Sequence, residues 1–143
     1  MRILIICTGN SCRSQMAHGF MQSFDETLTV CSAGTAPAGR VHPLAVKVMK
    51  EVGIDLSSHT PQRVEDFLQQ PWDYVITVCG GANESCPAFA GEVRHRLHMG
   101  FDDPSKSEGS EEVLLLEFRR VREEIKERFY RLYQQEISAS GKD

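Results

Sequence analysis

The sequence predicts an α/β fold in which a parallel sheet carries helices on both faces. Two observations lead to this class: short apolar runs alternate with amphipathic stretches along the 143 residues, and several of the runs are rich in β-branched side chains. A chain of this length without an internal repeat, a low-complexity tract or a linker is expected to form one domain. We expect that domain to span residues 1–143, with 138–143 as a frayed tail.

The first half of the chain is expected to hold two strands and two helices. The run Ile3-Leu4-Ile5-Ile6 marks a buried strand over residues 2–7. Over residues 13–24, apolar side chains recur on one helical face. A second strand is expected over 28–32. The helix that follows, over 42–52, has a proline in its first turn and a glycine at its end.

The second half is expected to begin with a short helix over residues 64–68. A β-branched run makes 73–79 the third strand. Residues 80–87 contain two glycines and a proline, so a mobile, turn-rich loop is expected there, before a fourth strand over 94–99. A long helix over 111–137 carries apolar residues three and four positions apart, namely Leu114, Phe118, Val121, Ile125, Phe129 and Leu132.

Charge and composition argue against several classes of protein. A formal net charge of -4 gives no support for nucleic acid as the main partner. No window approaches 18 apolar residues, so no membrane span is expected, and the N-terminus lacks the features of a signal peptide. Five cysteines in such a chain fit a reducing cytoplasm, where thiols are more often catalytic or redox-active than structural. Nothing in the sequence demands more than a monomer.

Residues 7–14, Cys-Thr-Gly-Asn-Ser-Cys-Arg-Ser, lie between the first expected strand and the first expected helix. Such a turn aims backbone N–H groups, the helix dipole and the guanidinium of Arg13 at one point, which suits a tetrahedral oxyanion. The same field favours the thiolate of Cys7, the nucleophilic form, and Ser14 can donate a hydrogen bond to it. The alternative is a buried strand-end cysteine near an unrelated surface arginine. The expected binding residues are Thr8, Gly9, Asn10, Ser11, Cys12 and Arg13.

Two further cysteines suggest a second chemistry. Cys79 ends the third expected strand as Cys7 ends the first, and ligand sites in open α/β sheets lie at that carboxyl edge. Adjacent strands are about 4.8 Å apart, so Cys79 could reach an adduct formed on Cys7. Cys86 follows across the glycine-rich segment and could close a small ring with Cys79. The alternatives are a small buried hydrophobe at Cys79 and a structural loop thiol at Cys86.

Asp103 precedes Pro104, which holds it in an extended conformation. A carboxyl group fixed in this way could protonate a leaving oxygen at the anion site, although a solvated loop acid is an equally good interpretation. No step needs Cys12, and Cys31 is most simply a core residue. The five histidines are scattered, and no CxxC pair or histidine cluster has the spacing of a metal site. We therefore expect no metal.

Five segments resemble arsenate reductases of the thioredoxin-coupled type, which share the fold of low-molecular-weight protein tyrosine phosphatases. The resemblance covers nearly the whole chain and includes CTGNSCRSQMA from Cys7, SAG from Ser32, KEVGIDLS from Lys50, VCG…SCP from Val78 and GFDDP from Gly100. The cysteine pair Cys79 and Cys86 is specific to the reductases. The resemblance implies a three-layer α/β/α fold with a four-stranded parallel sheet of order 2-1-3-4.

The resemblance also implies a reaction, the reduction of arsenate to arsenite in arsenical resistance. Cys7 would attack the arsenic while Asp103 protonates the leaving hydroxyl. Cys79 would then attack Cys7 and release arsenite. Cys86 would move the disulfide to the Cys79–Cys86 pair, which thioredoxin or a similar dithiol protein would reduce. Such a relay needs no bound redox cofactor.

The chain departs from its apparent relatives at two places. Some relatives hold a potassium ion through Asn10, Ser32 and two carboxylates, but His18 and Gln62 stand at the carboxylate positions here, so no such ion is expected. Phosphatases typically follow Asp-Pro with tyrosine, whereas this chain has Ser105. A low-molecular-weight protein tyrosine phosphatase is therefore the second hypothesis, with weak phosphatase activity compatible with the first. A third is a redox-sensing or anion-binding module without turnover.

Overall fold

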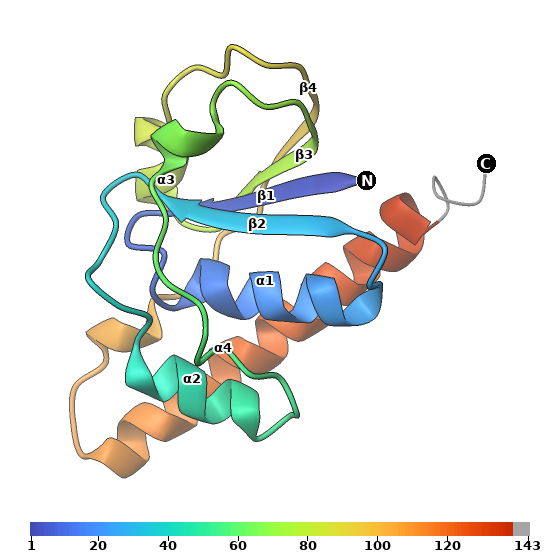
Figure 1. Cartoon of the computed structure of the whole chain (residues 1–143). Coiled ribbons are helices and arrows are strands. Elements are labelled where there is room, and N and C mark those ends of the chain that lie inside the picture. The colour runs from blue at the N-terminus through green and yellow to red at the C-terminus, as the bar shows by residue number, and fades with distance from the viewer. Residues whose placement is uncertain (139–143) are drawn as a thin grey trace.

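The structure is a computed structural model that describes residues 1–138, and it contains one four-stranded sheet (Figure 1). The strands pair in the order β2-β1-β3-β4, and every pairing is parallel. They are β1 (Arg2–Cys7), β2 (Thr29–Gly34), β3 (Trp72–Thr77) and β4 (Val93–His98). The predicted fold class and the order 2-1-3-4 are therefore confirmed.

The central strand β1 brings the start of the anion loop to the carboxyl edge of the sheet. Its residues 3–6 are fully buried, because helical layers cover both faces. Ile6 lies opposite Thr77 of β3, so Cys7 and Cys79 follow from adjacent strands at the same edge. On the other side, Cys7 lies opposite Gly34 of β2.

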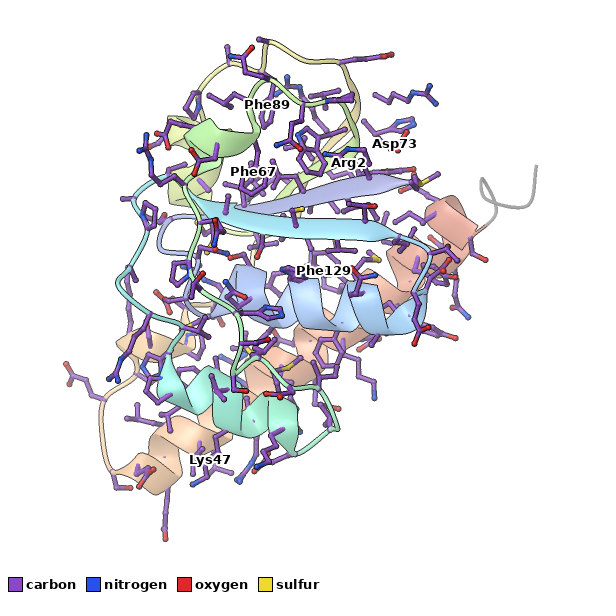
Figure 2. All side chains as sticks on the ribbon, viewed as in Figure 1. Arg2, Lys47, Phe67, Asp73, Phe89 and Phe129 are labelled. Atoms are coloured by element: carbon purple, nitrogen blue, oxygen red, sulfur yellow. The ribbon has the colours of Figure 1, made fainter. Side chains whose placement is uncertain are left out.

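Three helices cover one face of the sheet (Figure 1). They are α1 (Arg13–Phe24), α2 (Pro43–Lys50) and α4 (Glu111–Leu132), which continues as a π-helical turn over Tyr133–Ile137. Phe129 of α4 points into the layer between α4 and the sheet (Figure 2). The opposite face carries α3 (Gly80–Ser85) and the 3-10 turn η1 (Val64–Phe67), with Phe67 and Phe89 on that side (Figure 2).

The buried stripe of α4 matches the prediction except in its first turn, where Leu115 is buried and Leu114 is only half-buried. Here α4 packs against α2 as well as α1, and Lys47 of α2 faces Glu111 across that contact. The contact with α2 buries an additional part of the surface of α4 near its first turn. The apolar spacing within α4 alone does not predict such a contact.

The segment 80–87 is not the irregular loop that its glycines predict, because residues Gly80–Ser85 form α3. The Cys79 sulfur accepts a hydrogen bond from Ala82 N at 3.4 Å, and Cys86 N donates to Ala82 O at 3.0 Å. Ala82 itself is fully buried. Satisfied helix ends and a buried alanine outweigh the low helix propensity of two glycines.

Two further expectations concern the chain end and membranes. Ser138 closes the last helical turn, and residues 139–143 of the expected tail lie outside the described part of the chain. Among residues 1–138, no helix is both long and apolar enough to span a bilayer.

Candidate active site

The loop after β1 directs two hydrogen-bond donors at the Cys7 sulfur. Asn10 N lies 3.1 Å from Cys7 Sγ, and Ser14 Oγ lies 2.9 Å from it. Asn10 Nδ2 also donates to Ser14 Oγ at 2.7 Å, so the hydroxyl hydrogen of Ser14 is available for the sulfur. Asn10 has a left-handed backbone, with φ of 51°, which asparagine tolerates better than most residues. The arrangement stabilises a thiolate at Cys7.

A pocket of about 250 Å³ opens above this sulfur. Its lining residues are Cys7, Thr8, Gly9, Ser11, Cys12, Arg13, Asp103 and Lys106. Five of the six predicted binding residues are therefore in the lining. The exception is Asn10, which is fully buried and supports the loop from behind.

Asp103 comes from the segment after β4, which is distant from the anion loop in sequence but lines the same pocket. Its Oδ2 lies 3.4 Å from Arg13 Nη2, while its Oδ1 accepts hydrogen bonds from Ser105 N at 3.0 Å and Ser105 Oγ at 2.6 Å. One carboxyl oxygen is therefore held by its own turn, and the other faces the pocket. Arg13 Nη1 also donates to Phe101 O at 3.1 Å, which fixes the guanidinium. The neighbouring Asp102 is exposed and pairs with Arg120 instead.

Cys79 contacts the residue that follows Cys7 in the chain. Its Sγ is 3.3 Å from Thr8 Oγ1, and Thr8 directly follows Cys7. Cys79 is buried, and α3 separates it from the half-buried Cys86. Burial raises the pKa of Cys86, the nearby Arg96 lowers it, and Glu65 raises it again. The structure thus brings Cys79 to the site, with Cys86 at the far end of α3.

The two other cysteines differ from these in their surroundings. Burial raises the pKa of Cys12 to about 12, so its thiol stays protonated at neutral pH even though it lines the pocket. Cys31 is half-buried against the core on β2, and burial raises its pKa as well. Neither environment favours a nucleophile.

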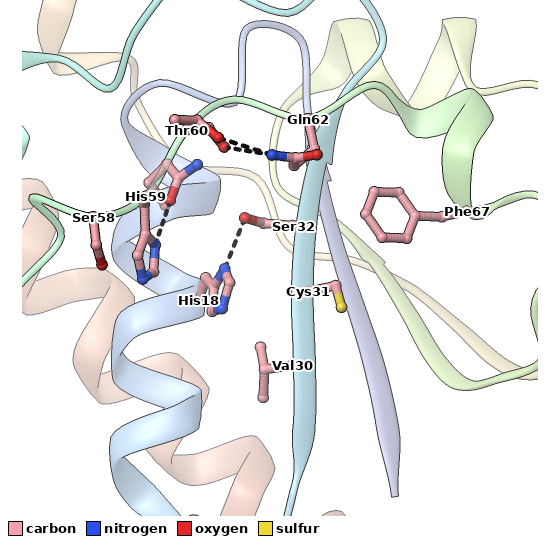
Figure 3. A pocket seen from close by; sticks show the side chains of 10 residues that line it. His18, Val30, Cys31, Ser32, Ser58, His59, Thr60, Gln62 and Phe67 are labelled. Atoms are coloured by element: carbon pink, nitrogen blue, oxygen red, sulfur yellow. Dashed lines mark hydrogen bonds between the residues drawn. The ribbon is translucent and has the colours of Figure 1, made fainter.

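The sequence analysis missed a network of hydrogen bonds behind the anion loop, formed by Asn10, Gln15, His59 and Gln62. Gln15 Nε2 donates to Asn10 O at 3.2 Å and to Asn10 Oδ1 at 3.1 Å. Gln62 N donates to the same Oδ1 at 3.0 Å. The Oε1 of Gln15 can only accept, so His59 Nδ1 donates to it across 2.9 Å (Figure 3). The signal for Gln15 was a long polar residue beside the apolar residues Met16 and Ala17 in α1.

Gln15, His59 and Gln62 line a second pocket, of about 330 Å³, together with His18 and Ser32 (Figure 3). His18 Nδ1 lies 2.9 Å from Ser32 Oγ, and the His18 and His59 rings are 4.7 Å apart. Burial, and secondarily the charge of His59, lower the pKa of His18 to about 4, so its ring is neutral at pH 7. Among the described residues, no group of three or more His, Cys, Asp or Glu side chains could hold a metal ion.

The parallel sheet, the cysteine at the end of its central strand and the arginine that begins α1 define a class of cysteine-dependent, oxyanion-binding proteins. Residues 2–142 match the model of the low molecular weight phosphotyrosine protein phosphatases, and the chain belongs to this family. A curated arsenate reductase of Halalkalibacterium halodurans is 48% identical over 127 residues, which are 88% of this chain and 90% of that protein. The resemblance seen in the sequence motifs is confirmed.

Solved structures agree with this assignment. A structure described as an arsenate reductase in the phosphate binding state superposes with a TM-score of 0.79 at 34% identity, over 94% of this chain and 97% of the other. The thioredoxin-dependent arsenate reductase of Corynebacterium glutamicum superposes with a TM-score of 0.67 at 28% identity, over 93% of this chain and 60% of the other.

Proposed function

We propose that this protein reduces arsenate to arsenite through Cys7, Cys79 and Cys86, with thioredoxin or a similar dithiol protein as the final reductant. The single observation that supports it most is that a second thiol lies next to the anion loop, since Cys79 Sγ contacts Thr8, the residue after Cys7. The names of the similar proteins agree with the substrate and with the reductant. A relay of free thiols needs a reducing compartment, so we place the protein in the cytoplasm, with a role in arsenical resistance.

The first two steps take place in the pocket. Arsenate binds to the loop N–H groups and Arg13, and the Cys7 thiolate attacks arsenic. Asp103, a carboxylate in the resting site, takes up a proton as the substrate binds and passes it to the oxygen that leaves as water. Cys79 then attacks the Cys7 sulfur, and the electron pair of the S–As bond moves to arsenic. As(V) becomes As(III), arsenite leaves with the thiol proton, and a Cys7–Cys79 disulfide remains.

The third step transfers the disulfide outward. Cys86 attacks the Cys79 sulfur, and Cys7 leaves as a thiolate that Asn10 N–H and Ser14 stabilise. A helix rises 1.5 Å per residue, so α3 holds the two cysteines roughly 10 Å apart, whereas a disulfide needs Cα atoms within about 7 Å. Residues 80–85 must therefore unwind. The dithiol partner then reduces the Cys79–Cys86 disulfide and its own thiols become the disulfide.

The relay is tested by following NADPH consumption with arsenate, thioredoxin and thioredoxin reductase. Cys86→Ser should release about one arsenite per protein molecule, stop with a Cys7–Cys79 disulfide and show almost no multiple turnover. Cys31→Ser, which changes a half-buried thiol away from the pocket, is the matched control and should keep the parent rate. If Cys86→Ser sustained the parent rate, the relay would be wrong.

A phosphatase activity is the second candidate, because Cys7, Arg13 and Asp103 suffice for phosphoester cleavage and share one pocket. The Ser105 hydroxyl is bonded to Asp103 and offers no aromatic face to a phenyl ring. We therefore propose only weak hydrolysis of aryl phosphates. The test is p-nitrophenyl phosphate turnover with the parent and with Cys7→Ser. A kcat/KM for the ester above that for arsenate reduction would reverse the order of the two candidates.

A further inference from the structure

Lys106 shares the pocket with Cys7, Arg13 and Asp103, although the sequence patterns gave no reason to select it. It lies at the end of the 3-10 turn η2 (Pro104–Lys106), and its backbone N donates to Asp103 O at 3.2 Å. The same short turn therefore positions both the carboxyl group and the lysine. Lys106 is exposed, so it lies at the rim of the pocket rather than at its base.

The two cationic side chains of the pocket, Arg13 and Lys106, differ in whether their charge is already paired. Arg13 is held between Asp103 Oδ2 and Phe101 O, so part of its charge is already compensated. Lys106, in contrast, makes no ion pair with any carboxylate among the side chains that the structure describes. A thiolate at Cys7 and the Asp103 carboxylate both repel an incoming dianion, and Arg13 alone has to offset them.

We propose that Lys106 is a second cationic binding residue, which recruits a small tetrahedral dianion such as arsenate and contacts its outward oxygens. The inference rests on the proposed function only for the name of the substrate. Arg13, below it, remains available for the oxygens at the reacting end. A lysine on a flexible stem suits this role, since it provides a compact charge that follows the anion into the pocket. With Lys106 in the lining, the opening is cationic, which favours inorganic oxyanions over aryl esters.

The first test uses inorganic phosphate as the probe and does not depend on reduction. Iodoacetamide alkylation of Cys7 is followed by peptide mass spectrometry over a range of phosphate concentrations, each variant normalised to its own unprotected rate. For Lys106→Gln, the phosphate concentration giving half-protection should rise roughly three- to tenfold, the effect of one nearby charge in a solvated pocket. The difference should shrink at high ionic strength, and Lys106→Arg should restore most of the protection.

Lys126→Gln is the matched control, because this α4 lysine lines a different surface pocket with Phe24 and Tyr130. It removes the same net charge and should leave half-protection unchanged. Equal half-protection in the parent and Lys106→Gln would overturn the inference, and so would an equal loss in Lys126→Gln, which would indicate a general charge effect.

The arsenate kinetics provide the second readout. In Lys106→Gln the loss should fall mainly on KM, with a similar three- to tenfold rise, rather than on kcat. A loss confined to kcat would contradict a binding role. If no variant reduced arsenate while phosphate protection still depended on Lys106, the proposed function would fail and the anion site would stand.

Discussion

Asn10 Nδ2 and Ser14 Oγ are joined by a hydrogen bond of 2.7 Å, in which the amide can only donate. The serine therefore accepts from the asparagine and can turn its own hydrogen toward Cys7 Sγ, 2.9 Å away. Asn10 thus acts on the nucleophile twice, through its backbone N–H and through the orientation of Ser14. We therefore expect the reactivity of Cys7 to depend on Asn10 and Ser14, which both lie under the pocket rather than in its lining.

Ser14→Ala is expected to slow Cys7 alkylation by iodoacetamide at pH 7 roughly ten- to hundredfold. The reason is that a hydrogen bond to a charged group contributes about 1.5–3 kcal/mol. Ser23→Ala is the matched control, since this serine lies on the same helix and bonds only to Phe20 O. Equal alkylation rates for Ser14→Ala and the parent would show that the hydroxyl does not act on the thiolate.

Gln15→Met should lower the free energy of unfolding by about 1–3 kcal/mol, because it removes the side-chain donor to Asn10 O, one of two donors to Asn10 Oδ1 and the partner of the half-buried His59 ring. It should also slow Cys7 alkylation, since Asn10 loses its support. Urea denaturation and alkylation are measured on the same samples. Gln22→Met, at the other end of α1, should cost stability without changing the alkylation rate. Unchanged Cys7 reactivity in Gln15→Met would limit Gln15 to a structural role.

The pKa of His18 predicts acid sensitivity. Its value in the folded protein is about 4 against 6.5 for a free histidine, so the unfolded chain binds an extra proton between these two values. Stability should therefore be independent of this group above pH 6.5 and fall as the pH drops toward 4, by up to about 1.4 kcal/mol per pH unit. Urea denaturation from pH 7.5 to 4.5 measures the slope. His18→Gln, which can keep a bond to Ser32, should flatten it, and an unchanged slope would exclude His18 as the source.

Arg96 should make Cys86 more reactive. Burial raises the pKa of Cys86 and the Arg96 charge opposes that effect, so Arg96→Gln should reduce the thiolate fraction. We expect iodoacetamide alkylation of Cys86 at pH 7.5 to slow roughly two- to fivefold. The midpoint of its pH–rate profile should move to higher pH. Arg94→Gln on the same strand is the control, because Arg94 pairs with Asp73 instead. A profile that moves equally in both variants would assign the effect to the strand rather than to Arg96.

Local sequence patterns were sufficient to predict β1 and α1, the two elements that flank the anion loop. The apolar run of β1 and the helical spacing of α1 predicted residues 2–7 and 13–24, and the structure has Arg2–Cys7 and Arg13–Phe24. The chemistry of the loop between them follows from eight consecutive residues, so Cys7, Arg13 and Ser14 could be selected without tertiary information. Asp103 required the assumption that a distant turn returns to the pocket, which the fold satisfies.

The missed site residues depend on contacts between distant segments. His59 meets Gln15 across 44 residues of chain, and Gln62 meets Asn10 across 52. Lys106 lines the pocket only because η2 packs against α4 and returns to the anion loop. The helix α3 was missed for the opposite reason, since glycine propensity suggested a loop while a local cap by the Cys79 sulfur and a buried alanine favour a helix.

The six-residue helix α3 also acts as a spacer in the reduced protein. As long as it stays wound, a stray oxidant such as peroxide cannot link the two sulfurs at its ends, because they are too far apart for a covalent bond. In the proposed relay, this separation would limit futile oxidation of the Cys79–Cys86 pair in the resting protein and spare reducing equivalents for turnover.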